Sequence, residues 1–132
     1  MRPTVLIADA DELLAAAYRA FLVAEGFSVD WVTTGLACLD LLRERTPEAL
    51  ILDAELPWGG GVGVLEVMAR DLGMHSPAAV LLTARPPAIP TLPRGMSTPA
   101  MLIKPVSPLA ISQTLRALLD SRSIRRMQFH GR

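Results

Sequence analysis

The stretch Ala49-Leu50-Ile51-Leu52-Asp53 decides the fold, because four apolar residues run without interruption into a carboxylate. Turn-forming residues flank it, with Thr46-Pro47 before and Leu56-Pro57 after. A short continuous apolar run between turns is typical of a strand buried on both faces, as in the middle of a parallel sheet. Asp53 then lies at the carboxyl end of that strand, where open α/β sheets form their ligand crevice. It is the predicted centre of the functional site.

Four other segments have the pattern of strands. They are Thr4–Ala8, Ser28–Val32, Ala79–Thr83 and a short one that begins at Leu102-Ile103. Apolar residues at helical spacing follow four of the five strands. These residues are Leu14, Ala17, Tyr18 and Phe21, then Leu36, Leu39 and Leu42, then Val62, Leu65, Met68 and Leu72, and finally Ile111, Leu115, Leu118 and Leu119. Such alternation predicts a parallel sheet with right-handed crossovers and helices on both faces.

Local signals mark where the predicted helices begin and end. Thr34 and Ser107 are predicted N-caps, and Gly26 is placed to end the first helix. The glycine-rich run Gly59–Gly63 lacks the Lys-Ser/Thr of a phosphate-binding loop and the spacing of a dinucleotide fingerprint. We therefore predict that it is a flexible loop.

The composition limits the classes of protein to consider. At 132 residues the chain is long enough for one domain whose core needs no disulfide or metal. Lys plus Arg total 13, as do Asp plus Glu, so the charge gives no reason to expect nucleic acid or an anionic membrane as main partner. The single Cys38 is predicted to be a buried, reduced thiol, and no run resembles a signal peptide or membrane span. These features predict a soluble cytoplasmic protein.

Polar residues follow the predicted strands at their carboxyl ends. Asp9 and Asp11 follow the first strand, Asp53 the central one, Thr83 the next and Lys104 the last. Because the carboxyl ends of parallel strands share one edge of the sheet, these side chains form one constellation. Clustered carboxylates bind Mg²⁺, a carboxylate can attack phosphorus, and a hydroxyl and an ammonium can hold a phosphoryl group. The constellation predicts phosphoryl chemistry.

Four motifs give the chain its resemblance to the receiver domain of two-component response regulators. They are Leu6-Ile7-Ala8-Asp9, Leu52-Asp53-Ala54-Glu55-Leu56-Pro57, Leu81-Leu82-Thr83-Ala84 and Ile103-Lys104-Pro105, in this order. The resemblance covers residues 4 to about 120, so a receiver domain is expected over 1–120. It implies a flavodoxin-like, doubly wound α/β fold with a five-stranded parallel sheet of order 2-1-3-4-5. Residues 121–132, with four arginines and no acid, are expected to form a basic C-terminal tail.

The resemblance also implies roles for the site residues. Asp53 would be the phosphoacceptor, which receives its phosphoryl group from a histidine kinase or a phosphotransfer protein. Asp9 and Asp53 would hold Mg²⁺ together with the backbone carbonyl of Glu55. Thr83 and Lys104 would contact the phosphoryl oxygens, and the peptide bond after the lysine would be cis.

Two acids near the site are each open to two interpretations. Asp11 is either a further metal-site acid or the N-cap of the next helix, and the N-cap is the simpler role. The side chain of Glu55 either supplies a carboxylate to the metal or is an exposed loop acid.

The sequence departs from the family pattern in three places. Ala10 stands where a second acid adjacent to Asp9 is normal, which removes a carboxylate expected to touch the metal. Met101 occupies the place of the aromatic switch residue, three residues before the lysine. Between Ala84 and Ala100, where a fourth helix is due, stand five prolines. A proline inside a helix costs about 3 kcal/mol, so we predict that this helix is lost or irregular.

We therefore expect a receiver domain that stands alone, is phosphorylated on Asp53 in a Mg²⁺-dependent manner and signals by contact with a downstream protein. It is not expected to be an enzyme in the ordinary sense, and homodimerisation is left open. The alternative is a pseudo-receiver, a phosphorylation-independent interaction module with the same fold. A third reading, a small hydrolase of phosphate esters, is weaker because nothing else in the sequence forms a substrate pocket.

Overall fold

The computed structural model describes residues 2–57, 59–72, 75–85 and 98–130, the last six of these as backbone alone. Strands and helices alternate along the chain, as the sequence predicts. Their order is β1 (Thr4–Ala8), α1 (Glu12–Ala24), β2 (Ser28–Val32), α2 (Gly35–Glu44), β3 (Ala49–Asp53), α3 (Gly60–Leu72), β4 (Ala78–Thr83), β5 (Ala100–Ile103) and α4 (Pro108–His130).

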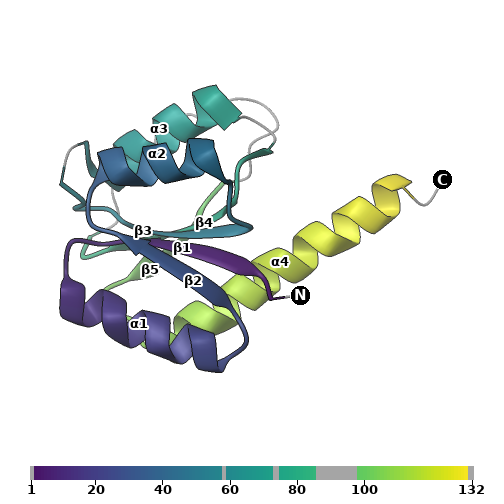
Figure 1. The fold of residues 1–132 in the computed structure, drawn as a ribbon. Coiled ribbons are helices and arrows are strands. Elements are labelled where there is room, and N and C mark those ends of the chain that lie inside the picture. The colour runs from purple at the N-terminus through teal and green to yellow at the C-terminus, as the bar shows by residue number, and fades with distance from the viewer. Residues whose placement is uncertain (1, 58, 73–74, 86–97, 131–132) are drawn as a thin grey trace.

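The five strands form one parallel sheet of order β2-β1-β3-β4-β5. The predicted doubly wound fold and its strand order are therefore confirmed. Helices α1 and α4 cover one face of the sheet, and α2 and α3 cover the other (Figure 1). Every residue of β3 is buried, as expected for a strand covered on both faces.

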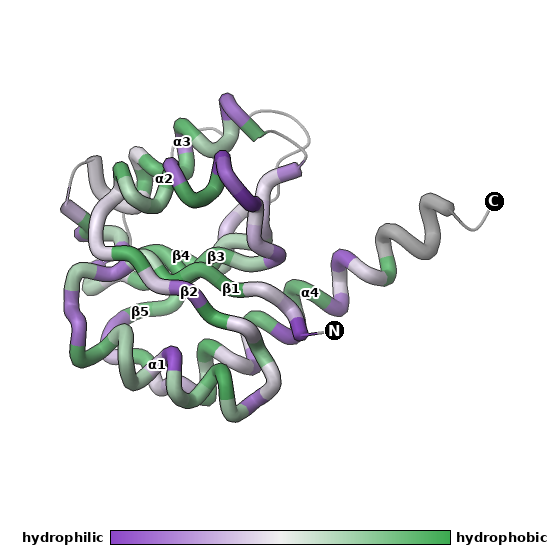
Figure 2. Tube along the Cα trace, viewed as in Figure 1, coloured by the Kyte–Doolittle hydropathy of each residue, from purple (hydrophilic) through white to green (hydrophobic). Residues whose placement is uncertain are grey.

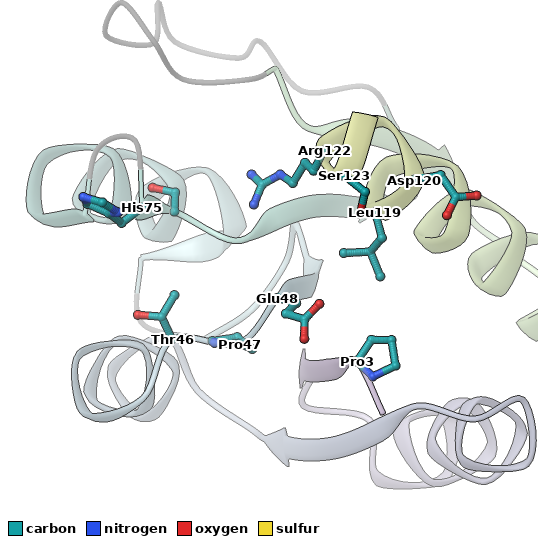
Figure 3. A pocket seen from close by; sticks show the side chains of 10 residues that line it. Pro3, Thr46, Pro47, Glu48, His75, Leu119, Asp120, Arg122 and Ser123 are labelled. Atoms are coloured by element: carbon teal, nitrogen blue, oxygen red, sulfur yellow. The ribbon is translucent and has the colours of Figure 1, made fainter. Parts of the chain in front are cut away.

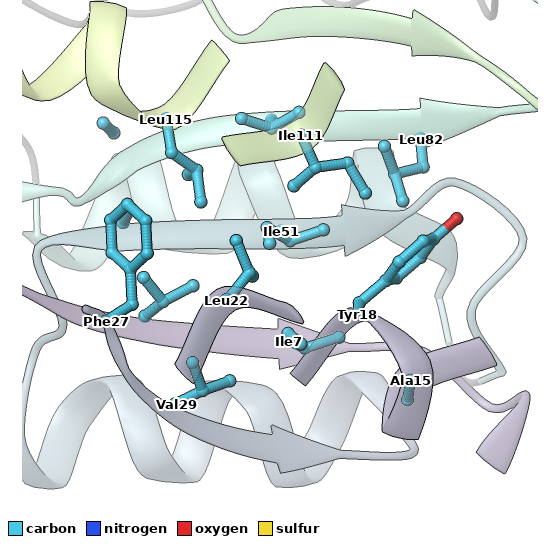
Figure 4. Packing of buried hydrophobic residues seen from close by; sticks show 14 residues of the cluster. Ile7, Ala15, Tyr18, Leu22, Phe27, Val29, Ile51, Leu82, Ile111 and Leu115 are labelled. Carbon is cyan, nitrogen blue, oxygen red and sulfur yellow. The ribbon is translucent and has the colours of Figure 1, made fainter. Parts of the chain in front are cut away.

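Two hydrophobic clusters, one on each face of the sheet, form the core. The cluster between the sheet and helices α1 and α4 contains Ile7, Tyr18, Leu22, Ile51 and Ile111 (Figure 4). The other contains Cys38, the predicted buried thiol, and burial raises the pKa of that thiol to about 12. The alternating faces of β1 and β3 feed both clusters, since successive residues of a strand point to opposite sides.

Two side chains cap the start of a helix and one glycine follows the end of a helix, as predicted. The Thr34 hydroxyl accepts a hydrogen bond from the Ala37 amide, 3.1 Å away, at the start of α2. Ser107 does the same for the amide of Ala110 at the start of α4. Gly26 has φ +99°, the left-handed conformation that glycine adopts after a helix.

Helix α3 corrects one prediction. The glycine run predicted to be a flexible loop enters the helix at Gly60. A Cβ on Gly61 would lie 2.7 Å from the backbone oxygen of Asp53 and 3.0 Å from the Cα of Ala54. Glycine is needed here because the first turn of α3 packs directly against the backbone that follows β3, a contact that local sequence rules cannot reveal.

Helix α1 corrects a second prediction. Its buried residues are Ala15, Tyr18 and Leu22, whereas Ala17, predicted to face the core, is exposed. The helix is coloured as hydrophobic over most of its length in Figure 2. When a helix is apolar on nearly all sides, the hydrophobic spacing does not determine which side faces the core.

Helix α4 extends well beyond Leu119, the last of the four apolar residues that predicted it. It runs to His130 and projects beyond the amino-terminal edge of the sheet (Figure 1), so residues 121–130 of the expected tail continue the helix. The division of the chain into 1–120 and 121–132 stays a prediction.

None of the helices in the described ranges has the length and apolar character needed to cross a membrane. Residues 86–97 of the proline-rich stretch lie outside the described residues, so the predicted loss or irregularity of the helix there stays a prediction.

Candidate functional site

The register of the sheet brings the predicted site residues to one edge. Ala8 pairs with Leu52, so Asp9 and Asp53 end neighbouring strands. On the other side of β3, Thr83 pairs with Ile103, which places Lys104 next to the end of β4. The central position of β3 makes Asp53 the middle of this edge.

Asp53 and Lys104 form an ion pair. The Nζ atom of Lys104 lies 3.0 Å from Oδ1 of Asp53, and the two side chains are 25% and 9% exposed. The same carboxylate oxygen accepts a hydrogen bond from the amide of Glu55 at 3.0 Å. A pair this sheltered from water is screened less than a surface ion pair, so the ammonium is well placed to neutralise charge at Asp53.

The backbone and electrostatic surroundings of Lys104 both favour this pairing. Its amide donates to the carbonyl of Thr83 at 2.8 Å, and the following peptide bond to Pro105 is cis, as predicted. Burial acts to lower the pKa of Lys104, but the hydrogen bond and charge of Asp53, with smaller effects from Asp9 and Glu55, outweigh burial and raise it. The side chain is therefore an ammonium at neutral pH.

Asp9 is the most unusual group at the site. It is 2% exposed, and its Oδ1 accepts a hydrogen bond from the amide of Asp11 at 2.9 Å. Its Oδ2 is buried and has no hydrogen-bond partner. Burial, followed by the charge of Asp53, raises the pKa of Asp9 above its ordinary value. A buried carboxylate oxygen without a donor is costly unless a cation or a proton meets it.

This unmatched oxygen fits a hard divalent cation. Mg²⁺ is usually bound through one or two carboxylates and several waters. No group of three or more acidic, histidine or cysteine side chains that could hold a metal occurs among the residues described here. A magnesium ion would thus depend on Asp9, Asp53, backbone oxygen and water.

The two ambiguous acids lie at the rim. Asp11 caps α1, since its Oδ1 accepts from the amide of Leu14 at 3.1 Å. The Glu55 side chain is 57% exposed, and its Oε2 lies 3.8 Å from Nζ of Lys104. Both simpler interpretations, a cap and an exposed loop acid, thus describe the structure, and a metal role for either side chain stays a prediction.

Thr83 is buried at the end of β4, and its hydroxyl bonds within the turn that follows. Its hydroxyl hydrogen-bonds with the backbone of Arg85, donating to the carbonyl and accepting from the amide. The structure thus joins Asp53 and Lys104 directly, while the hydroxyl of Thr83 is held within its own turn.

Two contacts at the site lay beyond sequence reasoning. The indole Nε1 of Trp31 donates to the backbone carbonyl of Asp9 at 2.8 Å, and the hydroxyl of Tyr18 donates to the carbonyl of Val106 at 3.2 Å. Neither aromatic residue belongs to a motif. The only signal available from the sequence is that a buried Tyr hydroxyl or Trp N–H usually needs a hydrogen-bond partner.

A cavity of about 430 Å³ lies at the opposite edge of the sheet (Figure 3). It is bounded by the residues before β1, β3 and β4 and by α4. Its lining comprises Pro3, Thr46, Pro47, Glu48, His75, Ser76, Leu119, Asp120, Arg122 and Ser123. No predicted site residue lines it, so the cavity is separate from the Asp53 site.

Comparison with curated proteins identifies regulatory proteins as relatives. The chain is 31% identical over 121 residues to the DNA-binding response regulator MtrA of Mycobacterium tuberculosis, covering 90% of this chain and 51% of that protein. It is equally similar to the phosphate regulon transcriptional regulatory protein PhoB of Rhizobium meliloti, of which it covers 53%. The chain thus spans about half the length of the curated relatives it matches.

Solved structures and a family profile complete the comparison. The Francisella response regulator 1452 receiver domain superposes with TM-score 0.79 at 19% identity, covering 92% of this chain and 99% of that one. The chemotaxis response regulator CheY4 of Vibrio cholerae does so with TM-score 0.77 at 17% identity, covering 89% and 99%. At these identities the likeness shows the fold. The profile of the response regulator receiver domain matches residues 5–116, and the chain therefore belongs to this receiver family of two-component signalling.

Proposed function

We propose that Asp53 is a phosphoacceptor, phosphorylated in a Mg²⁺-dependent manner by a histidine kinase or a phosphotransfer protein. The observation that carries this proposal is the Lys104 ammonium 3.0 Å from Asp53, beside the buried, unpartnered Oδ2 of Asp9. A nucleophilic carboxylate paired with a cation, next to a second carboxylate with an oxygen that has no hydrogen-bond partner, suits transfer of a phosphoryl group assisted by Mg²⁺.

Each residue has a definite part in the proposed transfer. A carboxylate oxygen of Asp53 forms a bond to phosphorus while the bond from phosphorus to the donor's histidine nitrogen breaks, and the electron pair stays on that nitrogen. Lys104 neutralises charge on the phosphoryl oxygens, and Thr83 donates to one of them after releasing the carbonyl of Arg85. Mg²⁺, when bound, would neutralise further charge on the phosphoryl group.

Asp9, Asp53 and the backbone carbonyl of Glu55 would hold that ion. The exposed Ala10 leaves the site one carboxylate short of the usual family set. Water or Asp11 would fill the remaining positions, since Mg²⁺ keeps several waters in most protein sites. The output of the proposed signal is contact with a downstream protein.

One incubation tests the proposal. The protein is treated with Mg²⁺ and acetyl phosphate, and its intact mass is compared with that of Asp53→Asn. We expect the native chain alone to gain the mass of a phosphoryl group, and EDTA to prevent the gain. A native chain that gains no mass and binds no beryllofluoride would instead support the pseudo-receiver alternative.

A further inference from the structure

Tyr18 is the only tyrosine of the chain and lies on the inner side of α1, 2% exposed. Its ring belongs to the hydrophobic cluster between the sheet and helices α1 and α4. Figure 4 shows its hydroxyl pointing along the strands toward their carboxyl ends, where the site lies. A buried phenol hydroxyl is costly unless it finds a hydrogen-bond partner, so its partner deserves an explanation.

That partner is the backbone carbonyl of Val106, 3.2 Å from the hydroxyl and 88 residues away in sequence. Val106 lies in the turn between β5 and α4, two residues after Lys104. The start of this turn is attached to β4, because the amide of Lys104 donates to the carbonyl of Thr83. The Tyr18 hydroxyl adds an attachment on the other side of the lysine, from α1.

The position of this turn matters because Lys104 depends on it. The reach of a lysine side chain is limited, so the place where the backbone holds its base limits how closely and how often the ammonium can approach Asp53. Coulomb energy falls with the distance between the two charges. The ring of Tyr18 packs with apolar residues, and phenylalanine would supply that packing equally well. The hydroxyl contributes only its hydrogen bond to the turn.

We propose that Tyr18 is a positioning residue: by donating to the carbonyl of Val106, it holds the turn that carries Lys104 so that the ammonium stays beside Asp53. The inference rests on the proposed function of Asp53, which it deepens, but the positioning step can be measured without any phosphoryl group. The hydrogen bond of the hydroxyl goes to Val106 and not to Asp53, so its effect on Asp53 passes through Lys104.

The chain offers an unusually clean measurement, because Lys104 is its only lysine. In protein labelled with ¹³C and ¹⁵N lysine, one set of side-chain resonances therefore reports this ammonium. Asp53→Asn supplies the reference in which the ion pair is lost. We expect Tyr18→Phe to move the lysine resonances toward that reference in the absence of Mg²⁺ and phosphate.

The matched control is Thr114→Val, which removes a side-chain hydroxyl that donates to the carbonyl of Ala110 within α4 at 2.8 Å. It should leave the lysine resonances at their native positions. Lysine resonances in Tyr18→Phe that coincide with those of the native chain would overturn the proposal. Shifts of equal size in both variants would do the same, because they would reflect general loosening.

The kinetic consequence is tested with acetyl phosphate. Tyr18→Phe should slow phosphorylation of Asp53 about three- to tenfold, which corresponds to the loss of one hydrogen bond. The affinity for Mg²⁺ should not fall, because no proposed ligand is changed and the positive charge beside Asp53 is held less closely, whereas general destabilisation would lower both the rate of phosphorylation and the affinity for Mg²⁺. A native chain that takes up no phosphoryl group would refute the proposed function, while the lysine resonances would still decide the role of Tyr18.

A second measurement serves if Tyr18→Phe does not fold. Growth with 3-fluorotyrosine labels Tyr18 alone in an otherwise native chain. If the turn couples Tyr18 to Lys104, the ¹⁹F resonance should move when Lys104→Met removes the ion pair with Asp53. An unchanged ¹⁹F resonance would contradict the proposal.

Discussion

The carboxylate of Asp9 is the residue at which stability and function oppose each other. Its pKa is raised by burial, so folding disfavours the charged form. The contribution of Asp9 to the free energy of unfolding is therefore most favourable where Asp9 is protonated. It falls as the pH rises from the pKa of the unfolded state through that of the folded state. The metal-free protein carries this penalty wherever Asp9 is ionised, and a bound cation would offset it.

We accordingly expect Asp9→Asn to stabilise the metal-free protein at pH 7, by about 1 kcal/mol. The gain should disappear below the ordinary aspartate range, and urea unfolding at pH 7 and pH 3 would measure it. Asp11→Asn is the control, because asparagine is an equally good N-cap and the position is exposed. An Asp9→Asn protein less stable than the native chain at pH 7 would contradict this account of the unpartnered oxygen.

Ala10 is expected to limit the affinity for Mg²⁺, because it stands where the family normally has a second acid. Ala10→Asp should tighten Mg²⁺ binding about tenfold, because hard cations are held mainly by charged oxygens. Tryptophan fluorescence can follow the titration, since Trp31 donates to the carbonyl of Asp9. Ala10→Asn controls for the added bulk. Equal affinities in the native chain and Ala10→Asp would mean that Asp11 or Glu55 already completes the site.

Gly61 is expected to couple the site to the stability of α3. In Gly61→Ala the new Cβ meets the backbone of Asp53 and Ala54, so we expect a loss of about 1–3 kcal/mol and slower phosphorylation. In Gly63→Ala the Cβ meets nothing within 4 Å, and better helix propensity should add about 0.5–1 kcal/mol. Urea unfolding of both variants checks this. Effects of the same sign and size would show that packing at Gly61 is unimportant.

At the scale of the element, α1 exposes an apolar stripe that the core does not use. Leu13 is 86% exposed and Val23 38%, and the exposed alanines between and after them lie on the same side. These alanines are Ala16, Ala17, Ala20 and Ala24. The stripe starts beside the Asp11 cap, two residues beyond the site. The protein donor proposed above has to reach this rim to deliver a phosphoryl group to Asp53, and we therefore expect it to contact the stripe.

The variant that tests this inference is Leu13→Glu. It should slow phosphotransfer from the protein donor about tenfold, as loss of an apolar anchor in an interface does. Phosphorylation by acetyl phosphate should not change, because that reaction needs no docking. Ile124→Glu, at a 55% exposed apolar residue in the C-terminal part of α4, is the control. An equal loss in both variants, or a loss with acetyl phosphate, would count against a donor contact at α1.

For the domain as a whole, the central question is which parts change conformation when Asp53 carries a phosphoryl group. Met101 stands where the family pattern has an aromatic ring, so we expect the second state usual in the family to be poorly populated. A ligand shifts an equilibrium only by its different affinity for two states. We expect beryllofluoride to shift amide resonances in the loops after β3 and β4, including Thr83–Arg85. Shifts that reach residues 111–119 of α4 would show a full switch, and none anywhere would indicate a pseudo-receiver.

Residue type and hydrophobic period were enough to predict the elements and the parallel sheet that they form, while the strand order came from the family resemblance. Continuous apolar runs identified β1, β3 and β4 as buried strands, and alternation with helical patterns implied a parallel sheet. Asp53 and Lys104 were then expected at one edge, and the structure brings them to 3.0 Å. These features follow from residue type and period, which are local properties that any short window of sequence carries.

Only the tertiary structure decided which particular groups meet. The bond from Tyr18 to Val106, the indole of Trp31 on the carbonyl of Asp9 and the close approach of Gly61 to Asp53 all join segments from different elements. Helix α1 shows the same limit: it has apolar residues on nearly all sides, and its packing against the sheet determines which side is buried. Periodicity reports that a side chain should be buried, but the partner it meets depends on how elements distant in sequence pack together.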